Sequence, residues 1–340
     1  VGRYNEENGI GFVLPDNKKM QQEVLVSPGR ANGAQIGQLV EVAITHWPTQ
    51  RFQAQGNIIE VLGEYMAPGM EIEVALRNYD IPHVWPDAVL KEAKRFKTEV
   101  EDKDKERRVD LRELPFVTID GADARDFDDA VYCEPRTGGD LVSGGWRLYV
   151  AIADVSHYVK VDSALDQEAA LRGNSVYFPE RVIPMLPEEL SNGLCSLNPH
   201  VDRLAMVCEI ALSHTGKMIG YQFYEAAIQS HARLTYDAVS AMLERPRSTE
   251  GKQFLTEYAA VAPHVKELYG AYKALQKQRH VRGAIDFETR ETRIVFGEDR
   301  KIAEILPTER NDAHKLIEEC MLCANVAMAS FLSDHELPGL

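Results

Sequence analysis

The chain has 340 residues, of which 44% are hydrophobic and 27% are charged, a balance typical of folded globular proteins rather than disordered or fibrous ones. At this length we expect two or three domains. The formal net charge of −15 argues mildly against nucleic-acid binding, although a local cluster of aspartates can produce such a total while basic residues line a binding path elsewhere.

The ends of the chain and its cysteines bear on where the protein works. The first residues lack an initiator Met and the apolar stretch of a secretory signal, so we expect the start to lie inside a longer protein. The longest nearly apolar stretch, residues 320–332, is too short for a membrane span, so no membrane is expected. Five cysteines, an odd number in a large chain, favour a reducing, cytoplasmic location without disulfides.

Residues 1–64 are expected to form a small β-barrel of the OB-fold (cold-shock-like) type. Short strand patterns alternate there with turn signals such as Asn8-Gly9 and Pro28-Gly29. The expected strands are residues 1–5, 9–14, 23–26, 39–46 and 55–62.

Such barrels bind RNA through exposed aromatic rings that stack on bases and basic side chains that follow the phosphates. The candidates are Tyr4, Phe12, Arg30, Arg51 and Phe52. An aromatic residue on a strand is more often part of the core, and that interpretation stays open for each ring.

Residues 65–110 are expected to be a linker that ends in a charged, solvent-exposed helix over residues 91–108. From residue 111 to residue 340 the pattern predicts a mixed α+β domain. Strands are expected at residues 116–119, 130–133, 146–153, 204–212 and 221–229. Helices are expected at residues 166–172, 236–243, 254–279 and 311–332, the last with Asn311 or Asp312 as N-cap.

The most informative stretch is residues 117–131 (VTIDGADARDFDDAV), where five aspartates lie within ten positions. A strand is expected to end at Asp120, Gly121 permits a turn, and Asp126, Asp128 and Asp129 precede the next strand. Two carboxylates about 4 Å apart repel each other by roughly 4 kcal/mol at an effective dielectric constant of about 20, so a converging set requires cations or bound protons.

An all-oxygen ligand set suits a hard cation such as Mg²⁺ or Mn²⁺ rather than zinc. An EF-hand calcium loop that starts at Asp120 is excluded, because Ala122, Ala124, Arg125 and Val131 occupy its ligand and glycine positions. A polar loop whose aspartates only cap turns remains the structural alternative.

Several motifs along the chain resemble those of the bacterial ribonuclease II and ribonuclease R family, with ribonuclease R the closer of the two. Besides residues 117–131, the matching stretches are residues 150–156 (VAIADVS), 175–179 (SVYFP), 182–198 (VIPMLPEELSNGLCSLN), 230–236 (SHARLTY) and 310–319 (RNDAHKLIEE). The resemblance implies an N-terminal OB-fold domain followed by an α+β exoribonuclease catalytic domain that is incomplete at its C-terminus. It implies hydrolytic, processive degradation of single-stranded RNA from a free 3′ end, with release of nucleoside 5′-monophosphates.

The resemblance also implies roles for individual residues. Asp120, Asp126, Asp128 and Asp129 would bind two Mg²⁺ ions, with Mn²⁺ as a possible substitute, for in-line displacement at phosphorus. The other residues implied are RNA contacts: Tyr177 and Phe287 would stack on the terminal bases, and Tyr236 with Glu318 or Glu319 would contact the ribose.

Ordinary structural roles remain open for these residues. Tyr177 and Phe287 could be core aromatics, and Glu318 and Glu319 are each four residues from a basic or His side chain on the expected helix. Cys320 and Cys323 have the spacing of a redox or zinc motif, but on an apolar helix they are expected to be buried packing residues.

Two other functions compete with the exoribonuclease. One is a non-catalytic RNA-binding or chaperone module with a degenerate catalytic half, and the other is a metal-dependent phosphatase for small substrates. The intact set of four aspartates argues against a degenerate catalytic half. A phosphatase for small substrates would not explain the presence of an RNA-binding barrel. No residue identifies protein partners such as RNA-decay or ribosome-associated factors.

Overall fold

The computed structural model describes residues 1–20, 22–136, 144–179, 181–285, 291–297, 302–308 and 310–339. The chain forms two compact units. The first unit comprises Val1–Trp85, Ser175–Ile183 and Ile294–Leu306, and the second comprises Pro86–Asn174, Pro184–Arg293 and Pro307–Leu340.

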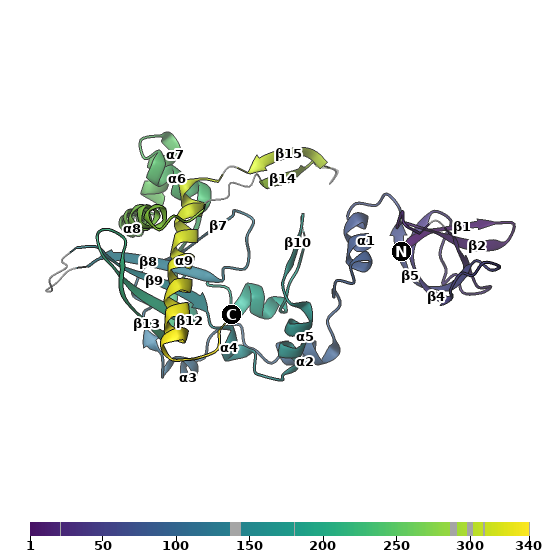
Figure 1. Ribbon diagram of the computed structural model, residues 1–340, viewed down its shortest axis with the longest axis horizontal. Helices are drawn as coiled ribbons and strands as arrows, with labels where there is room; N and C mark the ends of the chain where they lie inside the picture. The colour runs from purple at the N-terminus through teal and green to yellow at the C-terminus, as the bar shows by residue number, and fades with distance from the viewer. Residues whose placement is uncertain are drawn as a thin grey trace. The chain divides into compact units, whose positions relative to one another are not determined.

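The N-terminal part of the first unit is a closed barrel (Figure 1). Its strand order is β1-β2-β3-β5-β4. Its core is built from alternating inward residues such as Val13, Val24 and Val40, all less than 2% exposed. The strands are β1 (Gly2–Glu7), β2 (Ile10–Pro15), β3 (Val24–Val26), β4 (Gln38–His46) and β5 (Ala54–Glu64). The predicted five-stranded OB-type barrel is therefore confirmed.

The first unit also contains a helix and a hairpin that the sequence patterns did not predict. Helix α1 (Met70–Asn78) carries Arg77, whose guanidinium pairs with Glu60 at 2.7 Å and with Glu73 at 2.7 Å. Strands β10 (Val176–Phe178) and β11 (Arg181–Ile183) form a short antiparallel hairpin. A second two-stranded sheet consists of β14 (Glu291–Phe296) and β15 (Ile302–Thr308).

The second unit is built on a six-stranded sheet with the order β12-β9-β8-β7-β13-β6. The long strand β13 pairs first with β12 and then, from Ser230 to Thr235, in parallel with β7. The strands are β6 (Val109–Asp110), β7 (Phe116–Asp120), β8 (Asp129–Pro135), β9 (Trp146–Ala153), β12 (Asp202–Leu212) and β13 (Met218–Thr235).

Helices cover this sheet and complete its hydrophobic core. Leu268 and Tyr272 of α8 and Leu316 and Cys320 of α9 pack in one buried cluster with strand residues such as Leu148. The helices are α2 (Asp87–Ala93), α3 (Asp102–Lys105), α4 (Val155–Tyr158), α5 (Ala164–Arg172), a π-helix (Glu189–Leu194), α6 (Tyr236–Glu244), α7 (Thr249–Glu257), α8 (Ala262–Val281) and α9 (Asp312–Asp334).

Helix α9 begins as expected, because the side chain of Asn311 accepts hydrogen bonds from the backbone N–H groups of Ala313 and His314. With 23 residues and a mean hydropathy of 1.4, α9 is long and apolar enough to cross a membrane by length and composition. Its Leu316, Cys320 and Ala327 are at most 1% exposed in the core, and the core helix of a soluble protein passes the same test.

Two expected helices differ from the structure. The helix predicted over residues 91–108 is wrong: only α2 and the four-residue α3 form there. The stretch has no apolar stripe to bury, and Lys105 is held by an ion pair to Asp202 at 2.7 Å. The helix predicted over residues 254–279 is divided into α7 and α8, because Pro263 suits a helix start and not an interior.

Candidate active site

The aspartate-rich segment is the connection between two central strands of the second unit. Asp120 is the last residue of β7 and Asp129 is the first of β8, and the two strands are antiparallel, with Val117 opposite Val131. The carboxylate of Asp120 accepts a hydrogen bond of 2.7 Å from the backbone N–H of Gly121. Residues 121–128, which we call the aspartate loop, therefore leave and re-enter the sheet at neighbouring strands.

One side of the aspartate loop is anchored by Ser196, which is fully buried. The Ser196 hydroxyl accepts a hydrogen bond of 3.0 Å from the N–H of Phe127 and donates one of 3.1 Å to the carbonyl of Arg125. The carbonyl of Phe127 accepts a further bond of 2.8 Å from the N–H of Leu197. The backbone before Asp128 is thus fixed at three points.

The other side of the aspartate loop is anchored by Arg233 of β13. Its guanidinium donates to the carbonyl oxygens of Ala122 and Ala124, both at 2.9 Å. The same group lies over the ring of Phe127, with 4.6 Å between the guanidinium carbon and the ring centroid. Sequence reasoning placed Arg233 and Ser196 in matching motifs without a role, because no sequence pattern shows which backbone atoms they reach.

The aspartates of the site act on one another electrostatically. Burial is the largest cause that raises the pKa of Asp128 to about 6, and the charges of Asp126 and Asp120 add to it. The pKa of Asp129 is raised to about 6 by burial and then by Asp120 and Asp128. Burial also raises the pKa of Asp120. By accessible area Asp128 is nevertheless an exposed residue.

The fit of this site to metal ions is partial. The donor set is all oxygen, and a divalent cation would offset both the burial of the carboxylates and the mutual repulsion that together raise their pKa values. Within the residues that the structure describes, however, no three His, Cys, Asp or Glu side chains are arranged so that they could hold one ion. The carboxylates are electrostatically coupled, but they do not form a closed ligand shell.

Tyr236 lies close enough to the aspartates for their charges to act on its hydroxyl. Its pKa is raised to about 12 by burial and then by the charges of Asp120 and Asp129. Its ring stacks on the imidazole of His314, with centroids 3.9 Å apart and an interplanar angle of 19°. The residue that begins α6 is therefore held between the aspartate site and the first turn of α9.

The two glutamates of α9 differ in exposure. Glu319 is buried, and its carboxylate accepts a hydrogen bond of 3.0 Å from Arg279. The side chain of Glu318 is 37% exposed and forms ion pairs with Arg279, at 3.5 Å, and with Arg310. Glu318 is thus the one of the pair with a solvent-accessible carboxylate.

Of the predicted stacking pair, Tyr177 and Phe287, the structure describes only Tyr177. Tyr177 lies on β10 in the first unit and is 64% exposed, so the alternative that it is a core residue is wrong. Phe287 lies outside the described residues.

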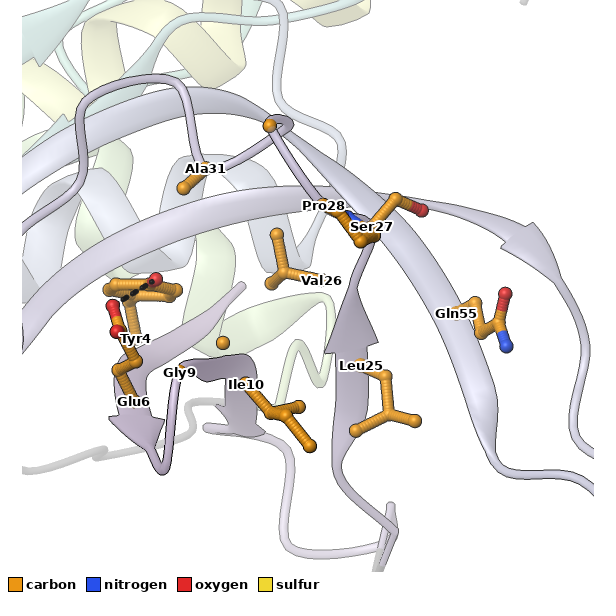
Figure 2. Close-up of a pocket in the computed structure, with 12 residues that line it drawn as sticks. Tyr4, Glu6, Gly9, Ile10, Leu25, Val26, Ser27, Pro28, Ala31 and Gln55 are labelled. Carbon is orange, nitrogen blue, oxygen red and sulfur yellow. Dashed lines mark hydrogen bonds between the residues drawn. The ribbon is translucent and has the colours of Figure 1, made fainter.

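On the barrel, Phe12 of β2 is half-buried and pairs with Leu25 of β3. Tyr4 is 4% exposed and belongs to the barrel core, so it offers no free ring face for stacking, and that expectation is wrong. A pocket of about 400 Å³ beside these strands is lined by Tyr4, Glu6 and Ile10, among others. The hydroxyl of Tyr4 donates to Glu6 at 3.3 Å (Figure 2).

The spacing of Cys320 and Cys323 has no chemical role in this structure. Both are buried, and neither is in a disulfide. Burial raises the pKa of the Cys323 thiol to about 12 and that of Cys320 well above its ordinary value. The predicted packing role is confirmed.

Comparisons with known proteins agree with this architecture. Residues 108–340 match the RNB domain and residues 12–86 match the Cold shock domain. The chain is 53% identical over 341 residues to ribonuclease R of Escherichia coli (strain K12), an alignment that covers all of this chain and 41% of the relative. The chain therefore spans about two fifths of the length of that protein.

Solved structures of RNase R also match this chain. RNase R of Mycoplasma genitalium in complex with ribose-methylated single-stranded RNA superposes with a TM-score of 0.87 at 30% identity, over 98% of this chain and 51% of that one. The same protein with double-stranded RNA matches with a TM-score of 0.87 over 99% of this chain and 57% of that one. The fold and site define a cold-shock barrel joined to a nuclease-type α+β domain. The chain belongs to the bacterial ribonuclease II and ribonuclease R family.

Proposed function

We propose that the protein is a hydrolytic, processive 3′-to-5′ exoribonuclease that releases nucleoside 5′-monophosphates from RNA. The observation that carries this proposal is the aspartate site, in which burial and then the charges of neighbouring aspartates raise the pKa values of Asp120, Asp128 and Asp129. Loops that only cap turns have no reason to hold ionisable carboxylates in this state. Family membership supports the same conclusion.

In this proposal Asp120, Asp126, Asp128 and Asp129 hold Mg²⁺, or Mn²⁺ in its place. Two such ions, when bound, supply an activated water and positive charge for the leaving 3′ oxygen. Ser196 and Arg233 act on the aspartate loop rather than on the substrate, because their side chains hydrogen-bond to its carbonyl and N–H groups and Arg233 also lies over the Phe127 ring. They set the spacing of the carboxylates before any ion binds.

The RNA contacts are proposed on residues of both units. Tyr177 and Phe287 would stack on the terminal bases, which is tolerant of sequence. Tyr236 would contact the ribose together with a glutamate of α9, and we favour Glu318 over Glu319 because its carboxylate is accessible. Phe12 would contribute an RNA contact on the barrel.

We further propose that the protein acts in the cytoplasm on single-stranded RNA with a free 3′ end. The domain boundaries that we propose are residues 1–64 for the barrel, 65–110 for the linker and 111–340 for the catalytic part. RNA-decay or ribosome-associated factors are compatible partners for such an activity.

The test is the substitution Asp128→Asn in the full-length protein, with Asp123→Asn as the matched control. Asp123 lies in the same loop but outside the proposed metal set. We expect D128N to abolish the shortening of 5′-labelled RNA in Mg²⁺ while RNA binding persists, and D123N to remain active. Hydrolysis by D128N at the wild-type rate would remove the aspartates from the mechanism.

The competing function is a non-catalytic RNA-binding module. Incubation of labelled RNA with the wild-type protein in Mg²⁺, with and without a chelator, separates the two. A binder leaves the RNA length unchanged in both, whereas the enzyme shortens it only without the chelator.

A further inference from the structure

The hairpin of β10 and β11 carries Tyr177 on one face and an ion pair on the other. In its register Tyr177 lies opposite Val182, and the next pair inward to the turn is Phe178 with Arg181. Because successive strand residues point to opposite faces, Tyr177 and Val182 share one face and Arg181 lies on the reverse. Val182 is 44% exposed, so the face that carries the Tyr177 ring is open to solvent.

A hairpin with strands of three residues needs an anchor, since an isolated two-stranded hairpin is at best marginally stable in water. Arg181 supplies one contact of this kind. Its Nη1 lies 2.5 Å from Oε1 of Glu73 on α1, and both residues belong to the first unit. The contact is made from the reverse face of the hairpin, so it leaves the ring of Tyr177 accessible.

Glu73 is held in turn by the barrel. Its Oε2 lies 2.7 Å from Nη1 of Arg77, whose side chain is only 7% exposed. The same guanidinium pairs with Glu60 of β5 at 2.7 Å and with Glu41 of β4 at 3.3 Å. We call these residues and Arg181 the ionic chain. It leads from two barrel strands through α1 to the hairpin.

The carboxylate of Glu73 is the branch point of the ionic chain. Burial acts to raise its pKa, but hydrogen bonds from Arg181 and Arg77 outweigh burial and hold the pKa below its ordinary value. Glu73 is therefore ionised at neutral pH and accepts one charged hydrogen bond through each oxygen. Charged hydrogen bonds are stronger than neutral ones and fix the direction of both partners.

We propose that Glu73 is a positioning residue for Tyr177: through Arg181 it holds the hairpin in the place where the ring meets a base of the RNA. This inference rests on the proposed function, because it assumes that Tyr177 stacks on RNA. It assigns a role to a side chain that does not itself contact the substrate, and it connects the barrel to the stacking residue.

The alternative role of Arg181 is a direct contact to an RNA phosphate, since its side chain is 41% exposed. The ion pair favours positioning, because the guanidinium already has a carboxylate partner. The two roles predict opposite effects of Glu73→Gln. If Arg181 binds phosphate, the substitution releases its charge and strengthens RNA binding. If Glu73 positions the hairpin, the substitution weakens stacking.

The experiment places the fluorescent base 2-aminopurine near the 3′ end of a single-stranded RNA, at one position per oligonucleotide, bound to the full-length protein in chelator. Stacking on an aromatic ring quenches this base. The position to be read is the one at which Tyr177→Ala restores the fluorescence. The test variants are E73Q, R181Q, R181K and E73Q/Y177A.

The matched control is Glu71→Gln, which makes the same change on the same helix. Glu71 is exposed, and side chains two positions apart on a helix do not face each other. Thermal unfolding of each variant verifies that the first unit is intact. The Kd for RNA is measured alongside the fluorescence.

An ion pair of this exposure shifts an equilibrium by roughly 2- to 5-fold, so we expect E73Q and R181Q each to lower the equilibrium constant for stacking by that factor. R181K keeps the charge and should recover part of the loss, whereas E71Q should match the wild type. Adding E73Q to Y177A should leave the Kd for RNA unchanged, because the hairpin has already lost the ring that Glu73 positions.

Wild-type fluorescence in E73Q, at a position that responds to Y177A, would overturn the proposal. Tighter RNA binding by E73Q with weaker binding by R181Q would also overturn it and would assign Arg181 to a phosphate. An equal loss of affinity on adding E73Q to the wild type and to Y177A would show a general structural role instead.

If no position responds to Y177A, the stacking role of Tyr177 fails and the proposal fails with it. Failure of the proposed function has a different signature. In that case the wild-type protein does not shorten RNA in Mg²⁺, whatever the fluorescence measured in chelator.

Discussion

The ring of Tyr236 lies flat on the imidazole of His314, with 3.9 Å between the ring centroids. Tyr236 begins α6 directly after β13, and His314 is in the first turn of α9. The stack therefore joins two segments that are separate in the sequence. At this point burial, and then the charges of Asp120 and Asp129, raise the pKa of the tyrosine.

The hydroxyl of Tyr236 is expected to report on ribose recognition. Tyr236→Phe keeps the stack and removes one hydrogen-bonding group, so cleavage of RNA should fall by roughly 2- to 10-fold, the value of one ordinary hydrogen bond. An oligonucleotide with 2′-deoxy sugars at its 3′ end lacks the 2′-hydroxyl that Tyr236 would contact. The wild type and Tyr236→Phe should therefore cleave this oligonucleotide at the same rate. Equal losses for both substrates in single-turnover assays would contradict a ribose contact.

Arg233 is expected to control metal binding without touching the metal. Arg233→Ala removes both hydrogen bonds to the aspartate loop, and divalent-cation affinity should fall by roughly 10- to 100-fold, as for other residues that orient a ligand-bearing segment. Arg233→Lys should recover part of it, because an ammonium lacks the planar fork of a guanidinium. Mn²⁺ binding measured by electron paramagnetic resonance in the absence of RNA provides the readout.

The matched control for Arg233 is Arg245→Ala, which removes an exposed arginine that pairs only loosely with Glu250, at 3.7 Å. It should bind Mn²⁺ as the wild type does. Unchanged affinity in R233A would show that the aspartate loop keeps its shape without this contact.

The aspartate site should destabilise the metal-free protein at neutral pH. An unfolded aspartate has a pKa near 4, whereas the folded pKa of Asp128 is raised to about 6. As the pH rises from about 4 to about 6, the unfolded state ionises first, so the folded state loses stability over this window. Asp128→Asn should therefore raise the thermal unfolding temperature in chelator above pH 6 and have no effect below pH 4.

Asp202→Asn is the control, and it should change the unfolding temperature in the opposite direction to Asp128→Asn. Burial acts to raise the pKa of Asp202, but hydrogen bonds from Lys105 and Arg112 outweigh it and hold the pKa below its usual value. The carboxylate thus contributes stability above pH 4 that is lost as the pH falls, and its removal should lower the unfolding temperature at neutral pH. The same direction of change in both variants would contradict the electrostatic account of the aspartate site.

The cysteines are expected to be chemically silent in the native state. Burial raises the pKa of Cys195, Cys208 and Cys323 to about 12, so hardly any thiolate is present at neutral pH. A thiol reagent should label the native protein slowly and label all five cysteines in urea. Rapid labelling of Cys320 or Cys323 before unfolding would reopen the redox interpretation of their spacing.

Much of the fold follows from local sequence signals. The alternation of residues 1–64 predicts the barrel strands, and the cap at Asn311 predicts the start of α9. The charged stretch 91–108 was wrongly assigned because its charge pattern resembles a helix surface, while tertiary ion pairs decide its conformation.

The sequence indicates candidate site residues, and in the structure Asp120, Asp126, Asp128 and Asp129 interact electrostatically. The density of aspartates in residues 117–131 indicates a cation site without any coordinates. What sequence reasoning could not provide is how the aspartate loop is held, because Ser196 lies 71 positions from Arg125 and Arg233 lies 111 positions from Ala122. Contacts of this range depend on how the sheet closes.

That separation has a consequence for biosynthesis. The carboxylates leave the ribosome about 110 residues before the arginine that fixes their loop, and β13, which delivers it, pairs in parallel beside β7 only after that delay. Until then a nascent chain has the acidic residues but not their geometry. In the proposed exoribonuclease, the geometry of the metal site would therefore form only after β13 has been synthesised.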